Sequence, residues 1–261
     1  GQVKKQLDFQ KIPINVAISE KGDLIVASFT NTDLSVIDPE NLTVQKSIPT
    51  GMISIDLALG ENGWAYLAPV LYDNNNNLTC VDLHSGQLVK INRNLYGLSW
   101  LKKVPGKSLL YGSKIGWSPD FLLVFDISQG AVNPVIDEWW TTLYKFWPSE
   151  DGQRIFTGML NVYQSPGYQA KGMIMESPAL LGQFESISGS LYSMEHSQAL
   201  KEIFVACRNS IWEAGNQILR IDDSGYFIKK IHGLNNLTLT ENGNVISVTP
   251  EIPYMYINKA G

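Results

Sequence analysis

Short apolar stretches separated by turn-forming residues follow one another along the whole chain. Within the first 50 residues, four such stretches lie at roughly 14–19, 23–28, 33–38 and 42–48, and Gly, Asn, Asp or Pro occurs between them. No stretch keeps the three-and-four spacing of an amphipathic helix over a useful length. The pattern therefore predicts an all-β protein made of short antiparallel strands.

A glycine-containing turn followed by an apolar strand recurs along the sequence. The glycines concerned are Gly22, Gly63, Gly106, Gly152 and Gly243, at intervals of 41, 43, 46 and 91 residues. The last interval spans two periods, and the missing copy falls at 197–200, where the turn has no glycine. A period of about 44 residues that holds four strands is typical of the blade of a β-propeller.

A second series runs in phase with these turns and consists of apolar strands that end in a carboxylate or an amide. Its members are Asp38, Asp82, Asp126, Glu176, Asp222 and Asn258. A side-chain oxygen at the end of a strand can accept hydrogen bonds from the backbone amides of the following turn. We therefore expect these six residues to form turns rather than pairs of catalytic carboxylates.

The repeats predict one domain, residues 1–261, folded as a six-bladed β-propeller of four-stranded antiparallel blades. The blades are expected at 14–48, 54–91, 97–136, 144–187, 190–231 and 234–261. The last copy lacks its outer strand, whereas residues 3–9 are a spare strand ahead of the first blade. We expect residues 3–9 to pair with residues 254–258, which would cover an exposed sheet edge and close the ring.

The first blade resembles one unit of the YVTN-type β-propeller repeat family. The matching segments are Ile18–Gly22, Val36–Asp38 and Ile48–Gly51, with Ile25–Ser28 in place of the tetrapeptide that names the family. Blades two, three and five match in part, and blades four and six are degenerate. The resemblance implies a secreted or surface-exposed propeller without fixed catalytic residues. We expect an extracytoplasmic protein from which a targeting segment was removed ahead of Gly1.

Large aromatic side chains gather in the loops expected at one mouth of the channel. Most of these loops join the second and third strands of a blade, and the connection at 137–141 joins two blades. The candidate ligand-binding residues are Tyr72, Trp117, Trp139, Trp140, Tyr163, Tyr168 and Trp212, with Arg208 as the charged partner. Two interpretations stay open: the rings plug the channel or pack between blades, or they form a stacking surface for a planar ligand.

The first function that we expect is a non-enzymatic binding or scaffold propeller. The alternative is a metal-dependent hydrolase or lactonase, which needs carboxylates and amides to converge on the channel axis. Asp56, Glu195 and Asn236 are the candidates for that set, although such sets arise easily by chance because inner strands begin or end in polar residues. No nucleophile elbow, phosphate-binding loop or HExxH motif is present, and we expect no cofactor.

Composition narrows the range of partners. Charged residues make up only 17% of the chain, and the net charge is −5, which argues against binding to nucleic acid. No apolar run approaches the roughly 18 residues of a membrane-spanning helix. We expect a monomer with a protein, peptide or carbohydrate ligand. Cys80 and Cys207 fall on opposite blades of the expected ring, too far apart for a disulfide.

Overall fold

The structure, a computed structural model, is all-β in the part of the chain that it describes. That part comprises residues 6–70, 78–91, 98–114, 121–140, 145–166, 179–184, 187, 191–208, 216–233, 237–241 and 244–248. It contains 22 strands and no helix. The chain divides into two compact units, Gly1–Lys145 with Gly167–Ser177, and Phe146–Pro166 with Pro178–Gly261.

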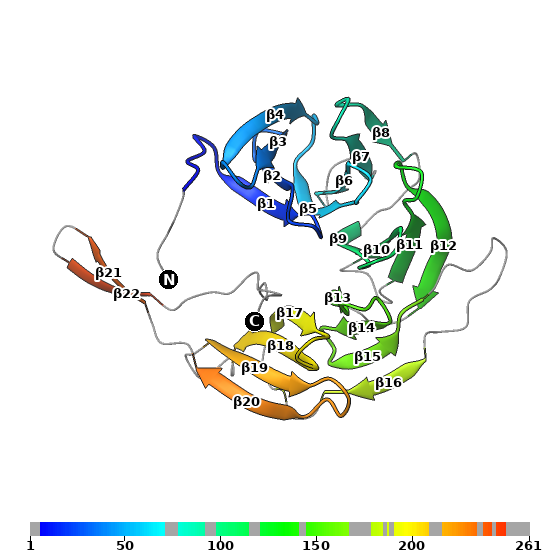
Figure 1. Cartoon of the computed structure of the whole chain (residues 1–261), viewed down its shortest axis with the longest axis vertical. Helices are drawn as coiled ribbons and strands as arrows, with labels where there is room; N and C mark the ends of the chain where they lie inside the picture. The colour runs from blue at the N-terminus through cyan, green and yellow to red at the C-terminus, as the bar shows by residue number, and fades with distance from the viewer. Residues whose placement is uncertain are drawn as a thin grey trace. The chain divides into compact units, whose positions relative to one another are not determined.

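The described strands form five four-stranded antiparallel sheets and one two-stranded sheet, and in each sheet strands adjacent in sequence pair with one another (Figure 1). The first sheet contains β1 (Pro13–Ile18), β2 (Ile25–Phe29), β3 (Asp33–Asp38) and β4 (Thr43–Pro49). The second contains β5 (Ser54–Leu59), β6 (Trp64–Pro69), β7 (Thr79–Asp82) and β8 (Leu88–Lys90). The third contains β9 (Leu98–Lys103), β10 (Leu109–Lys114), β11 (Phe121–Asp126) and β12 (Asn133–Trp140).

The remaining sheets belong to the second unit. The fourth sheet contains β13 (Phe146–Pro148), β14 (Arg154–Thr157), β15 (Asn161–Gln164) and β16 (Leu180–Gln183). The fifth contains β17 (Leu191–Ser197), β18 (Glu202–Arg208), β19 (Asn216–Asp222) and β20 (Ile228–Gly233). β21 (Leu237–Glu241) and β22 (Asn244–Val248) form the two-stranded sheet. The expected four-strand repeat is therefore confirmed in five copies.

The glycine turns and the strand-end acids take the local structure that the sequence predicts. Four of the repeated glycines have a left-handed backbone, with φ between +63° and +78°. Asp38, Asp82, Asp126 and Asp222 each accept a hydrogen bond from a backbone amide two residues later, at 2.8–2.9 Å. The hydrogen bond from the Ser224 hydroxyl, followed by those from the Gly225 and Ser224 amides, lowers the pKa of Asp222 to about 2. Glu176 and Asn258 lie outside the described residues.

The fourth sheet corrects one expected strand. Its third strand is β15, well ahead of the stretch expected to end at Glu176. A tight turn after β14 is the reason, because the Leu160 amide donates to the Thr157 carbonyl at 2.9 Å and Leu160 takes a left-handed φ of +66°. A leucine in that conformation is uncommon, so no glycine marked this turn in the sequence.

Two apolar layers hold the sheets of the first unit together. One cluster joins the first and second sheets and includes Val26, Leu34, Leu57 and Leu67. The other joins the second and third sheets and includes Tyr66, Leu78, Leu101, Leu110 and Phe125. Within this unit the first strands of consecutive sheets lie side by side, so β5 contacts both β1 and β9 (Figure 1). Burial of alternate side chains on both faces of each sheet drives this stacking.

The start of the chain differs from the expectation. Residues 6–9 are not in a strand, and residues 3–5 and 254–258 lie outside the described residues. Instead, Phe9 packs edge-on against Phe29, with ring centroids 5.0 Å apart, and Leu7 contacts the same small cluster. Residues 6–9 are thus held on the first sheet by apolar packing and not by strand pairing.

Both cysteines are buried and free of disulfide bonds, as predicted. Burial raises the pKa of the Cys80 thiol to about 11, so this group has little thiolate character at neutral pH. The described residues contain no helical segment with the length and apolar character that crossing a bilayer requires.

Candidate functional site

Four of the seven aromatic residues proposed for ligand binding are not among the residues that the structure describes. Tyr72, Trp117, Tyr168 and Trp212 lie outside the described residues. Arg208 is exposed at the end of β18. The shared aromatic surface therefore stays a prediction.

Three of the proposed loop residues are in strands. Trp139 and Trp140 end β12, where they pair with Leu122 and Phe121 of β11, so the expected connection at 137–141 is wrong. Tyr163 is in β15, paired with Ile155 of β14. Aromatic residues suit the pleated surface of a sheet, and this preference outweighs the turn signals that had placed them in loops.

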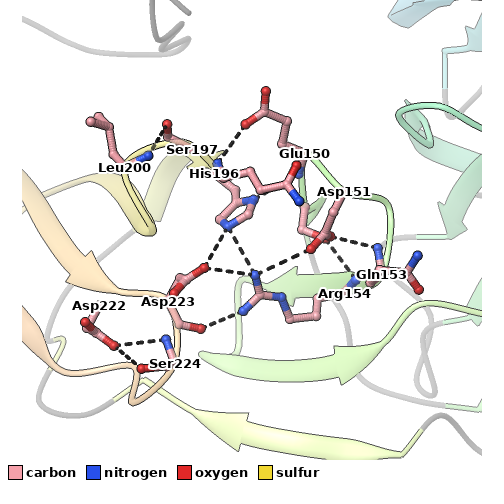
Figure 2. Close-up of polar contacts among 12 residues, drawn as sticks. Glu150, Asp151, Gln153, Arg154, His196, Ser197, Leu200, Asp222, Asp223 and Ser224 are labelled. Atoms are coloured by element: carbon pink, nitrogen blue, oxygen red, sulfur yellow. Dashed lines mark hydrogen bonds and ion pairs between the residues drawn. The ribbon is translucent and has the colours of Figure 1, made fainter. Parts of the chain in front are cut away.

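A polar network with a buried histidine at its centre joins the fourth and fifth sheets (Figure 2). The His196 side chain, from β17, is fully buried. Its Nδ1 atom accepts a hydrogen bond from the Glu150 amide at 3.1 Å, and its Nε2 atom lies 3.3 Å from the Asp223 carboxylate. Arg154 of β14 donates to the Asp223 carbonyl at 2.6 Å and also approaches the Asp223 carboxylate at 3.3 Å.

The geometry of this network indicates a structural role. Because Nδ1 accepts the backbone hydrogen bond, a neutral imidazole carries its proton on Nε2, which lies 3.3 Å from the Asp223 carboxylate and 3.1 Å from the Arg154 guanidinium. Neither ring nitrogen is then available to take a proton from a substrate. Glu150 extends the network by accepting from the Gln198 amide at 2.8 Å. The network therefore connects two sheets by satisfying their buried polar groups.

Buried polar side chains connect the sheets of the first unit in a similar way. Asn15 of β1 donates to the Ser54 carbonyl of β5 at 3.1 Å. Asp56 of β5 accepts from the Leu101 amide of β9 at 2.7 Å and from its neighbour Leu57 at 2.9 Å. Each of these two polar residues follows a register shift at the start of its strand. The sequence shows them only as polar residues near the start of an inner strand.

The hydrogen bonds of Asp56 are relevant to the alternative function, a metal-dependent hydrolase, because Asp56 was one of its three candidate ligands. Burial raises the pKa of Asp56 above its ordinary value, and both of its carboxylate oxygens accept backbone hydrogen bonds. Glu195 is in β17 of the second unit, and Asn236 lies outside the described residues. Within the described ranges, no three His, Cys, Asp or Glu side chains gather as metal ligands would.

A charged cluster that the sequence analysis missed lies on the repeated turns of the first unit. Lys103, at the end of β9, contacts the carboxylates of Glu20 and Glu61, which belong to the β1–β2 and β5–β6 turns. Burial and hydrogen bonding to Glu61 raise the pKa of Glu20, whereas hydrogen bonding to Glu20 and the charge of Lys103 lower the pKa of Glu61. The protonation of one of these two carboxyl groups therefore depends on that of the other.

Two open hollows flank this cluster. One, of about 260 Å³, lies between the β1–β2 and β5–β6 turns, and the other, of about 230 Å³, lies beside Lys103 and the β9–β10 turn. Glu61 lines both. The repeated Glu-x-Gly turns were the signal for this site, because equivalent turns of stacked sheets meet at the same end.

Comparison with known proteins does not place the chain in a family: no protein-family model matches it, and none of the curated proteins does.

Proposed function

We propose that this protein is a non-enzymatic binding or scaffold protein that acts outside the cytoplasm. In this proposal its four-stranded sheets are the blades of a six-bladed β-propeller of the YVTN-like type. The two stacked interfaces in the first unit and the regular period of the sheets support the propeller.

The observation that carries the proposal is how the buried polar side chains are used. Three buried polar side chains could in principle bind or react with a substrate, namely Asn15, Asp56 and His196. Each of them instead forms a hydrogen bond with the backbone of a neighbouring sheet. A catalytic base or nucleophile needs an atom directed at the substrate. Side chains that connect sheets instead favour a rigid platform whose loops and turns bind a partner.

A ligand screen tests this proposal. The purified protein is applied to glycan and peptide arrays, and Trp117→Ala, Trp140→Ala and Trp212→Ala are compared with it in both binding and melting temperature. Loss of binding at an unchanged melting temperature supports an aromatic binding surface. A lower melting temperature, with no partner found on any array, supports rings that pack inside the protein.

Metal analysis distinguishes the enzymatic alternative. Elemental analysis is followed by a calcium titration and an assay with lactone and ester substrates. We expect no calcium-dependent turnover. Hydrolysis that depends on calcium, and that is lost in Glu195→Gln, would overturn the proposal in favour of a metal-dependent hydrolase.

A further inference from the structure

We propose that Lys102 and Lys145, held against Trp100 in the first unit, form a binding site for an oxyanion, that is, a carboxylate, phosphate or sulfate group. This inference goes beyond the proposed function and does not depend on the aromatic loop residues.

The two ammonium groups are brought to one aromatic side chain from different parts of the chain. Lys102 and Trp100 are two residues apart on β9, and Lys145 immediately precedes β13. The Nζ atom of Lys102 lies 4.7 Å from the centroid of the Trp100 ring, and that of Lys145 lies 4.9 Å from it. All three residues are partly exposed, so a ligand can reach them. The indole face stabilises both cations but provides no negative charge to neutralise them.

Neither ammonium group has a hydrogen bond or an ion pair with any described residue. Lys103, which follows Lys102 on β9, is paired in contrast. Lys103 contacts two carboxylates and also donates to the Val104 carbonyl at 3.2 Å. Among the described residues, the contacts of Lys102 and Lys145 are those with Trp100, together with their mutual repulsion and longer-range attraction to Asp56. Six ammonium protons are therefore available to acceptors from outside this part of the chain.

The nearby carboxylate does not neutralise the pair. Asp56 is buried, and its oxygens accept hydrogen bonds from the Leu57 and Leu101 amides. Burial, followed by repulsion from Lys102, lowers the pKa of Lys145, although attraction to Asp56 opposes this. Among the described side chains, the site thus holds two like charges near one buried carboxyl group, which is a local excess of positive charge.

An oxyanion that bridges the two ammonium groups relieves their repulsion. Charge-assisted N–H···O hydrogen bonds to an anion are stronger than those between neutral groups. The packing of both lysine side chains on one ring also limits their rotamers before the ligand arrives, which lowers the entropy cost of binding. The ligand class is therefore an anionic group with several acceptor oxygens, either free or carried on a larger molecule.

Calorimetric titration with citrate, inorganic phosphate and sulfate tests the site, with ionic strength held constant by sodium chloride. We expect at least one of these anions to bind, and Lys102→Met and Lys145→Met to weaken its binding by roughly tenfold or more each. Lys90→Met, at an exposed position on β8, serves as the matched control and should bind as the wild type does. Comparison of the three anions distinguishes a carboxylate site from a phosphate or sulfate site.

A second measurement needs no variant. Lysine acetylation of the wild-type protein is followed by mass spectrometry with and without saturating anion. Modification of Lys102 and Lys145 should slow when the anion is bound, whereas that of Lys90 should not. The proposal is overturned if none of the three anions binds, or if the affinity is the same in both lysine variants and modification of the two lysines is unprotected.

Discussion

At the scale of single residues, the repeated turns show how one backbone requirement is met by different side chains. Gly22, Gly63 and Gly152 provide left-handed conformations in the first, second and fourth sheets. The corresponding turn of the fifth sheet has no glycine, and Lys201 takes a φ of +52° there. A residue with a Cβ atom is strained in this region by about 1–2 kcal/mol. Lys201 is exposed, so no buried contact of its side chain offsets that strain.

Lys201→Gly should therefore stabilise the protein. We expect the free energy of unfolding to increase by about 0.5–1 kcal/mol, because relief of the strain exceeds the additional backbone entropy of glycine in the unfolded chain. Chemical denaturation measures the change. Lys230→Gly, in the extended strand β20, is the control and should lower the stability instead. Equal losses in both variants would show that the turn is not strained.

At the scale of elements, the first strands of neighbouring sheets are connected by side chains as well as by apolar packing. In the first unit, Asp56 on β5 bonds to the backbone of β9, and Asn15 on β1 bonds to the backbone of β5. These bonds satisfy the buried Leu101 amide and the buried Ser54 carbonyl, which matters because an unpaired buried polar group costs about 1–3 kcal/mol.

Asp56→Ala should weaken the junction of the second and third sheets. Two amides, those of Leu57 and Leu101, lose their acceptor, so we expect a loss of about 2–4 kcal/mol in the free energy of unfolding. Asp56→Asn keeps one acceptor oxygen and should lose less. Denaturation at neutral pH, with circular dichroism to confirm the fold, provides the measurement.

The pH dependence of the same variant checks the ionisation of Asp56. Because burial raises its pKa in the folded protein, its carboxyl group contributes most to stability below its unfolded pKa of about 4. That contribution decreases as pH rises through the folded pKa. The difference between the wild type and Asp56→Ala should therefore be largest near pH 4 and smaller at pH 7. A difference that grows with pH would contradict the buried, desolvated position.

At the scale of the whole molecule, the start of the chain is attached to the first sheet. Phe9 and Leu7 pack on a small cluster with Ala27, Phe29 and Ile37. This contact does not require strand pairing, and it accounts for the apolar pattern of the segment. Whether residues 3–5 also pair with residues 254–258 stays a prediction.

Deletion of residues 2–10, compared with Phe9→Ala, distinguishes packing from ring closure. If the segment is held only by apolar packing, both variants should lower the melting temperature by a similar amount, from a loss of about 1–3 kcal/mol. If strand pairing closes a propeller, the deletion should cost much more than the single substitution, because it exposes a sheet edge. A deletion variant that melts like the wild type would exclude both forms of attachment.

Local signals in the sequence are sufficient to predict the repeating unit of this protein. The period of the glycine turns, the acids at strand ends and the alternation of apolar residues are local signals, and they predicted the four strands of the first sheet to within a few residues. They fail where a turn forms without glycine, as at Leu160, and where aromatic residues extend a strand, as at Trp139 and Trp140.

The contacts between polar groups from different sheets, in contrast, depend on how the sheets pack. Glu20 and Glu61 are 41 residues apart and Lys103 follows Glu61 by 42, and most of the third sheet lies between Trp100 and Lys145 in the sequence. Such contacts depend on how sheets stack and on which side of a strand each residue points. A single register shift, such as those that precede Asn15 and Asp56, reverses that direction without any mark in the sequence.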